Sequence, residues 1–200
     1  SYTATAWYHK KLSADLQRKP LVDVLRESES FASNELTLGL AKGDRMTDAE
    51  SKALAEKYSR LSGLSREFIQ NSKFRVDLGR FNKELLRTQN RTTGRLDSRF
   101  TGIDRDNAVA TPENDPSMSA IRPPYTAVFN HYVRGDLGFK SDTEYYILGG
   151  GITSPWNWNT TNGYANTAVP LQSAMQKNPF MKVWVASGYY DMATPYFATD

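Results

Sequence analysis

Met181-Lys-Val-Trp-Val-Ala-Ser-Gly-Tyr-Tyr-Asp191 is the stretch of the chain from which a fold class can be predicted. Its first six positions, 181–186, are apolar apart from one lysine, which is typical of a strand covered on both faces of a parallel sheet. Ser187 and Gly188 would end that strand in a turn. Functional side chains of open α/β sheets lie just beyond the carboxyl ends of strands, so Asp191 is a candidate orienter of a catalytic histidine. An acid at this distance from a strand is also a common turn former or helix N-cap, and that alternative stays open.

The prolines divide the rest of the chain into two parts. Residues 1–110 contain Pro20 alone and carry apolar residues at helical spacing, whereas all other prolines follow. Thr47 and Glu50 match a capping box, which predicts a helix that ends at Gly63. Further helices are expected over residues 1–12, 21–42, 65–71, 78–89, 125–133 and 168–177, and a strand over 144–148. Many helices followed by a buried strand suit a helical insertion that re-enters an α/β sheet.

Composition and charge narrow the class of protein. The chain has 200 residues, of which 39% are hydrophobic and 24% charged, as in an ordinary globular protein. A net charge of +3 is too small to indicate nucleic-acid binding. The absence of cysteine excludes disulfides and thiol nucleophiles, and no apolar window reaches the roughly 18 residues of a membrane span. We therefore expect neither a nucleic-acid nor a membrane partner, and we expect a chain that begins mid-protein or already processed, because it lacks a signal-peptide pattern.

Four separate stretches carry a family resemblance. They are Ala186-Ser-Gly-Tyr-Tyr-Asp191-Met-Ala-Thr-Pro195, the segment Phe81–Gly102 with its Arg91-Thr-Thr-Gly-Arg-Leu-Asp-Ser-Arg99 motif, the opening Ser1-Tyr-Thr-Ala-Thr-Ala-Trp-Tyr-His-Lys10, and Trp156-Asn-Trp158. Together they resemble the serine carboxypeptidase family, most closely its bacterial, cysteine-free branch. The resemblance implies an α/β fold of the α/β-hydrolase type. The chain would then comprise a mostly helical cap over residues 1–140 and, over residues 141–200, the re-entry into the hydrolase core with the aspartate-bearing strand.

The same resemblance implies a catalytic role for Asp191. Its carboxylate would accept a hydrogen bond from Nδ1 of the base histidine and stabilise the imidazolium that forms as serine attacks. The chain contains no Gly-x-Ser-x-Gly elbow, and His9 and His131 both precede Asp191, which is the wrong order for the base of this fold. We expect His9 to face solvent or cap a helix and His131 to be a surface or packed residue. The serine and the histidine are therefore expected outside this chain, which alone would be inactive.

The predicted function is part of a hydrolase that removes C-terminal residues from peptides by a Ser-His-Asp acyl-enzyme mechanism. Its expected partners are a peptide substrate and the remainder of the hydrolase core, and the resemblance implies a periplasmic or secreted protein. Two alternatives stay open. One is an acyltransferase or esterase of the same fold, and the other is a non-catalytic helical binding or interaction module.

Other candidate sites are weaker. Basic residues recur every four positions from Lys83 to Arg99, but interleaved acids favour an ion-paired, solvated face, with Asp97 and Arg99 as a local pair. Arg99 is retained as a candidate contact for a peptide carboxylate. Trp156 and Trp158 are candidate walls for an apolar side chain, with core packing as the alternative. Neither histidine has a metal-ligand spacing, so no metal or cofactor is expected.

Overall fold

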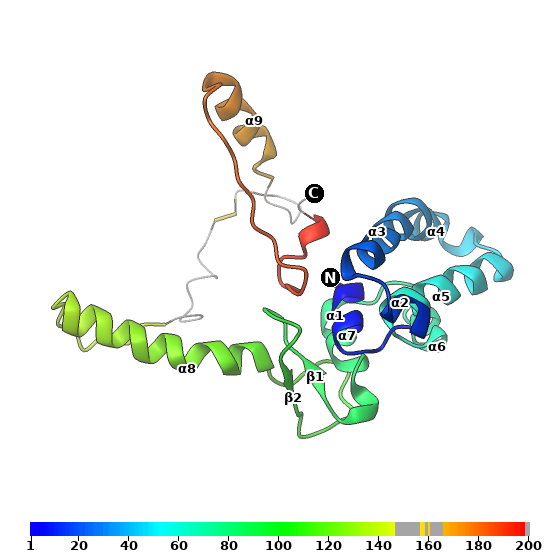
Figure 1. The fold of residues 1–200 in the computed structure, drawn as a ribbon, viewed down its shortest axis with the longest axis horizontal. Helices are drawn as coiled ribbons and strands as arrows, with labels where there is room; N and C mark the ends of the chain where they lie inside the picture. Colours follow the sequence, from blue (N-terminus) through cyan, green and yellow to red (C-terminus); the bar gives the residue numbers. More distant parts are fainter. Residues whose placement is uncertain (147–156, 159, 161–165, 199–200) are drawn as a thin grey trace. The chain divides into compact units, whose positions relative to one another are not determined.

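A computed structural model gives the fold of the chain (Figure 1) and describes residues 1–146, 157–158, 160 and 166–198. The chain divides into two compact units, one formed by Ser1–Pro124 with Ser187–Asp200 and the other by Tyr125–Ala186. Helices α1 to α7 belong to the first unit, α8 spans the boundary in sequence, and α9 belongs to the second. The α-helices are α1 (Tyr2–Tyr8), α2 (Ala14–Gln17), α3 (Leu21–Phe31), α4 (Thr37–Lys42), α5 (Asp48–Ser62), α6 (Arg66–Asn71), α7 (Leu78–Glu84), α8 (Pro116–His131) and α9 (Ala168–Lys177).

Shorter helical turns extend or connect these elements. The π-helical turn η1 (Ala32–Leu36) joins α3 to α4, so that residues 21–42 form the helical segment expected from the sequence, and η4 (Tyr132–Asp136) follows α8. The 3₁₀ turns are η2 (Gly43–Arg45), η3 (Arg87–Gln89) and η5 (Tyr196–Ala198). Helix α1 ends at Tyr8 rather than continuing to residue 12, because Lys10 adopts a left-handed φ of 58° that a helix cannot contain.

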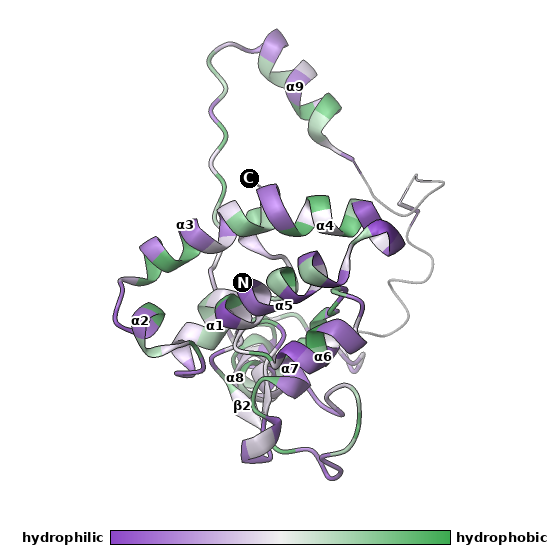
Figure 2. Ribbon diagram, turned by 90° about the vertical axis from the view of Figure 1, so that its right-hand side faces the viewer, coloured by the Kyte–Doolittle hydropathy of each residue, from purple (hydrophilic) through white to green (hydrophobic). Residues whose placement is uncertain are grey.

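The core of the first unit lies between the apolar faces of its helices, which Figure 2 shows in green. Leu16, Val24, Ile69 and Phe81 are fully buried there, and the ring of Tyr2 stacks on Phe81 with 4.0 Å between ring centroids. Burying one such side chain stabilises a fold by about 1.5–3 kcal/mol. Helix α1 is thus held in the centre of the unit, and it is the helix against which the loop containing Asp191 lies.

Helix α5 has the ends that its sequence predicts. The hydroxyl of Thr47 accepts a hydrogen bond from the backbone N–H of Glu50 at 3.3 Å, and the Glu50 carboxylate accepts one from the backbone N–H of Thr47 at 2.8 Å. Gly63 ends the helix with a left-handed φ of 73°, and a Cβ at this position would meet the carbonyl oxygen of Lys11 at 3.1 Å. The predicted helix from Thr47 to Gly63 is confirmed.

The prediction of an α/β-hydrolase fold is wrong for the described part of the chain. The sheet found there is one antiparallel pair of two-residue strands, β1 (Thr92–Thr93) and β2 (Thr101–Gly102), with Thr92 opposite Gly102. Residues 181–186 form no strand and are exposed, Trp184 by 86%. Residues 144–146 form none either, while the remainder of that predicted strand lies outside the described residues. An apolar run becomes a buried strand only when strands on both sides accept its backbone hydrogen bonds, and the described residues supply helices instead.

The second unit contains the helix α9 that the sequence predicts over residues 168–177. Helix α8 begins at Pro116, ahead of the predicted start at residue 125, and carries Pro123 and Pro124 within it. None of the second unit's described residues is buried. Among the helices of the described chain, none combines the length and apolar character needed to cross a membrane.

Candidate functional site

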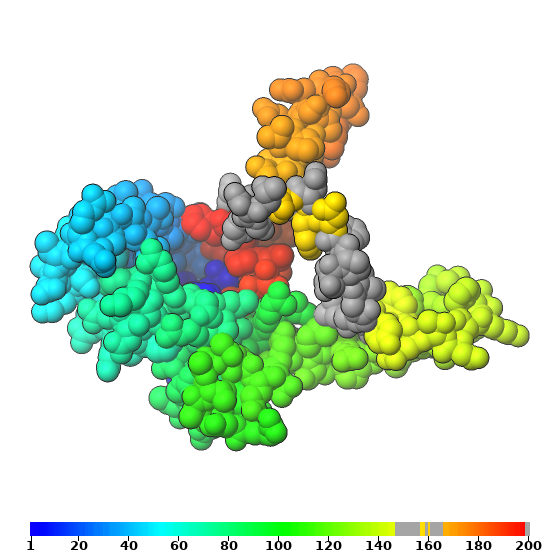
Figure 3. Space-filling model, turned by 180° about the vertical axis from the view of Figure 1, so that it is seen from behind, coloured from blue at the N-terminus to red at the C-terminus, as the bar shows by residue number. Residues whose placement is uncertain are grey.

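Asp191 lies on a loop of the first unit that follows the whole of the second unit in sequence. Figure 3 shows this C-terminal segment, in red, against residues from the N-terminus, in blue. Contact between the two is direct, because the hydroxyl of Ser1 donates a hydrogen bond to the backbone carbonyl of Asp191 at 2.8 Å. The side chain of Asp191 is half-buried, and its backbone N–H donates to the carbonyl of Gly188 at 3.2 Å. Asp191 therefore has a defined position against the start of α1.

The carboxylate of Asp191 accepts three hydrogen bonds from the turn that follows it. Oδ1 accepts from the backbone N–H groups of Ala193 at 2.8 Å and Thr194 at 2.9 Å, and Oδ2 accepts from the Thr194 hydroxyl at 2.5 Å. The turn-forming role considered from the sequence is confirmed. A carboxylate has about four acceptor positions, so the described residues fill both positions of Oδ1 and leave one on Oδ2.

Two backbone hydrogen bonds hold the loop on either side of Asp191. The carbonyl of Tyr190 accepts from the N–H of Ser98 at 3.0 Å, and the N–H of Met192 donates to the carbonyl of Arg95 at 3.0 Å. Met192 is 2% exposed and belongs to the main core cluster. The segment Arg95–Ser98 and the loop 190–192 thus lie side by side, with the backbone of Asp191 fixed between the two bonds.

Ser98 connects this pair of segments to α1. Its side chain is fully buried, and its Oγ lies 2.6 Å from Oγ1 of Thr5, which is also fully buried. Its carbonyl lies 2.8 Å from Nε2 of His9, and since a carbonyl can only accept, that nitrogen carries the proton. Burial lowers the pKa of His9, and the charge of Lys11 acts in the same direction, against an opposite effect of the bond to Ser98. His9 caps α1, as expected, but its ring faces the protein rather than solvent.

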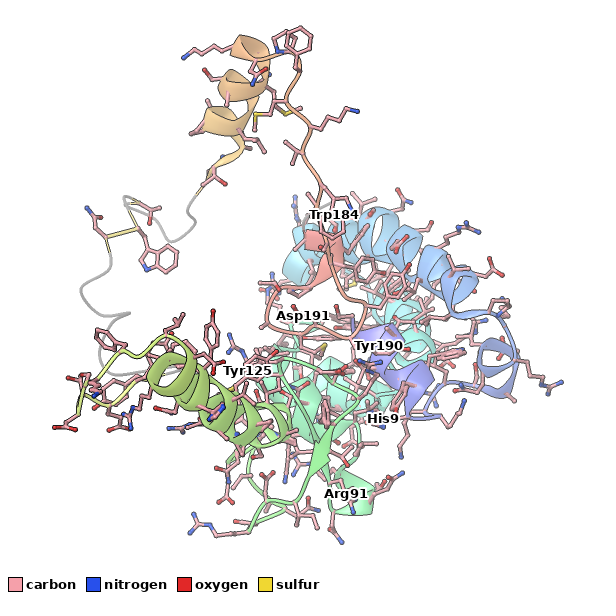
Figure 4. The ribbon with its side chains drawn as sticks, turned by 60° about the vertical axis from the view of Figure 1, so that its left-hand side comes forward. His9, Arg91, Tyr125, Trp184, Tyr190 and Asp191 are labelled. Atoms are coloured by element: carbon pink, nitrogen blue, oxygen red, sulfur yellow. The ribbon has the colours of Figure 1, made fainter. Side chains whose placement is uncertain are left out.

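Arg99 lies beside the loop on which Asp191 is found, because its guanidinium contacts the ring of Tyr190. Tyr190 and Asp191 are labelled on this loop in Figure 4. Its guanidinium pairs with the Asp97 carboxylate, with Nη2 and Oδ2 2.6 Å apart, and stacks over the ring of Tyr190 at 4.9 Å from the ring centroid. The local pair of Asp97 and Arg99 is confirmed. The contact of Arg99 with a peptide carboxylate stays a prediction. The guanidinium would have to bind this second carboxylate while it remains paired with Asp97.

The other members of the basic series do not form a stripe. Helix α7 ends at Glu84, so the four-residue spacing does not place them on one helical face. Arg87 pairs with Glu84 at 2.6 Å, as an ion-paired face requires. Lys83 instead pairs with Asp104 at 2.6 Å with both side chains 1% exposed, so the expectation of a solvated face is wrong at this position.

The remaining candidates lie apart from this site or outside the described residues. Trp158 belongs to the second unit and is 62% exposed, and Trp156 falls outside the described residues. His131 is an exposed residue at the end of α8. Within the residues that the structure describes, no three His, Cys, Asp or Glu side chains are grouped as metal ligands would be.

The sequence indicated Asp191 as a candidate and did not single out the residues that hold its loop. Thr5, Ser98 and Met192 lie within the stretches that carry the family resemblance, but nothing in those stretches indicates that they meet, because their contacts join positions far apart in the chain. Among the described residues, no histidine contacts the Asp191 carboxylate. Comparisons with protein-family models, with curated proteins and with solved structures find no match to the chain.

Proposed function

We propose that the chain supplies the acid of a Ser-His-Asp hydrolase of the serine carboxypeptidase type, with Asp191 as that acid. The observation that carries this proposal is the state of its carboxylate. Three donors hold it in one orientation, and among the residues that the structure describes none fills the remaining acceptor position of Oδ2. A histidine from outside these 200 residues donates its Nδ1–H to that position. Asp191 then fixes the tautomer of the base and stabilises the imidazolium that forms as the serine attacks the peptide carbonyl.

Orientation is what this acid contributes to the reaction. A side chain that must hold a histidine within a fraction of an ångström performs best when its own rotamer is locked by neighbouring hydrogen bonds. The two N–H groups on Oδ1 and the hydroxyl on Oδ2 supply that lock, and the bonds at Tyr190 and Met192 hold the backbone beneath it. Residues 1–140 act as the helical cap, residues 141–200 bring the acid to the active site, and the substrate is a peptide that loses its C-terminal residue outside the cytoplasm.

The test uses the intact gene product, a fluorophosphonate probe for the serine, and the variant Asp191→Asn. Asparagine retains a carbonyl that accepts the two backbone N–H bonds, so the turn stays folded. Its NH₂ group, placed at Oδ2, cannot accept from Nδ1–H, and kcat for release of a C-terminal residue falls by about 10⁴-fold, as for the buried acid of other triads. Asp44→Asn is the matched control, because it removes one charge from an exposed side chain.

The outcomes separate the alternatives. Labelling of the wild-type protein with release of C-terminal amino acids supports a carboxypeptidase, whereas labelling with transfer to or cleavage of an ester indicates an acyltransferase or esterase. A wild-type protein that neither labels nor turns over is the non-catalytic helical module. If Asp191→Asn keeps wild-type kcat in a protein that labels, Asp191 is not the triad acid.

A further inference from the structure

We propose that Ser98 is the positioning residue of Asp191 and that it acts by joining the loop of Asp191 to helix α1. This inference rests on the proposed function, since it assigns a role in the same site. Ser98 touches neither the carboxylate nor a substrate. Its three polar groups join two segments. Its N–H donates to Tyr190 on the loop, its carbonyl accepts from His9 at the end of α1, and its hydroxyl bonds Thr5 in the middle of α1.

The direction of the buried hydroxyl pair follows from the groups around it. Oγ1 of Thr5 lies 3.0 Å from the carbonyl oxygen of Ser1, to which it donates, and 2.6 Å from Oγ of Ser98. Each hydroxyl has a single proton, and the Thr5 proton goes to the carbonyl, which can only accept. The Ser98 proton therefore goes to Thr5. The side chains of Thr5 and Ser98 are both fully buried, so water cannot replace a hydrogen-bond partner that is lost there.

Thr5 also contacts the second of the two backbone hydrogen bonds that flank Asp191. Oγ1 of Thr5 lies 3.8 Å from the sulfur of Met192, whose N–H donates to the carbonyl of Arg95. Thr5 thus contacts a residue of each backbone bond that flanks Asp191, and α1 is the common support. Ala4 and Ala6 on either side of Thr5 are fully buried, which makes this part of α1 a rigid element.

A positioning role predicts changes that a purely structural role does not. If the Ser98 hydroxyl is lost, the segment Arg95–Ser98 keeps only the bond of its carbonyl to His9 at the end of α1. The loop is then held less firmly, and Asp191 loses its defined distance to the base histidine. Displacements of about 1 Å lower rates by up to about 10²-fold. The imidazolium is then less stabilised, so the pKa of the base falls and the acid limb of the kcat/KM profile moves to lower pH. Substrate contacts are untouched, so KM stays near its wild-type value.

The experiment measures kcat, KM and the pH profile of the intact gene product, with kcat expressed per active site from fluorophosphonate titration. Ser98→Ala should lower kcat about 10- to 100-fold with KM within about twofold, and should move the acid limb to lower pH. Thr5→Val removes the accepting hydroxyl with little change in shape and should do the same. Thr5→Ser retains the hydroxyl and should recover most of kcat. The matched control is Thr37→Val, which removes a hydroxyl that donates within a helix at an exposed position.

Three results are decisive. A lowered melting temperature in Ser98→Ala and Thr5→Val, with kcat per active site and the acid limb unchanged, makes Ser98 structural only and overturns the inference. If Ser98→Ala does not fold, equal kcat in Thr5→Val and Thr5→Ser overturns it in the same way. If the wild-type protein shows neither labelling nor turnover, the proposed function is wrong, and the positioning role is wrong with it. A result seen only in the variants concerns the positioning role alone.

Discussion

At the scale of single residues, the ion pair of Lys83 and Asp104 stands out because both of its charges are buried. Both side chains are 1% exposed, and the second Asp104 oxygen accepts from the backbone N–H of Glu113 at 3.0 Å. The pair fixes the loop 104–113 to α7. The sequence could not predict it, because the two residues are separated by a turn and a strand pair, and because a lysine among exposed basic residues has no local sign of burial.

Removing one member of this pair should be costly. Lys83→Met leaves the Asp104 carboxylate buried without a cation and should lower the free energy of unfolding by about 3–5 kcal/mol, as measured by urea denaturation. The double variant Lys83→Met with Asp104→Leu should lose much less, because no uncompensated charge remains. Arg26→Met, in an exposed pair with Asp23, should change stability by no more than about 1 kcal/mol. Equal losses in the two single variants would show that burial of the Lys83 pair does not matter.

His9 gives the folded protein a pH dependence of known sign. Burial lowers its pKa below the ordinary value of 6.5, so between the two values the unfolded chain binds more protons than the folded one. The stability contributed by neutral His9 is present in full above pH 6.5 and is lost as the pH falls through the lower folded-state pKa. The unfolding free energy of the wild type should therefore decrease between pH 7 and 5 more than that of His9→Gln, whose amide still donates to Ser98. The same slope in both proteins would contradict this assignment.

At the scale of elements, the sequence predicted correctly those helix ends that are determined by residues close together in the chain. The helix from Thr47 to Gly63 was predictable because a capping box and a left-handed glycine are local signals. The strand expected over 181–186 was not, since its formation depends on partner strands that an apolar run does not specify. The candidate site divides in the same way. Asp191 follows from a short motif, whereas the contacts of Thr5 and Ser98 with its loop depend on packing across the whole first unit.

The capping box provides a test of local control over α5. Thr47→Ala removes the acceptor of the Glu50 N–H and should lower the free energy of unfolding by about 1 kcal/mol, measured as a shift of the thermal midpoint. Thr47→Ser retains the acceptor and should remain close to wild type. A loss in Thr47→Ser as large as that in Thr47→Ala would indicate that the methyl group, and not the cap, stabilises the helix start.

At the scale of the whole molecule, the two units differ in burial. The first has a core of side chains such as Leu16 and Phe81, whereas none of the second unit's described residues is buried. The boundary expected at residue 140 came from the family resemblance, and the one at residue 110 from the distribution of prolines; neither reports which side chains are covered. Contacts between the N-terminal helices and residues after 186 were equally hidden, since they depend on tertiary packing alone.

This difference predicts the order of proteolysis. Trypsin should cut first after exposed sites of the second unit such as Lys140, Lys177 and Lys182, at least about tenfold faster than after Arg87 or Lys83. The peptide that contains Met192 should then remain bound to the fragment containing α1 through native size-exclusion chromatography. Early cleavage after Lys83, or immediate separation of the two fragments, would contradict this description.

The pair of backbone hydrogen bonds that joins Arg95–Ser98 to Tyr190–Met192 also has a consequence for chain length. It closes the first unit across residues 125–186, which makes that segment an insert within an otherwise continuous structure. The entropic cost of closing an inserted segment grows slowly with its length, by about 0.6 kcal/mol of free energy for each doubling. Changes in the length of residues 125–186 should therefore cost the first unit little free energy of folding, as long as the contacts of Thr5 with Ser98 and Met192 are kept.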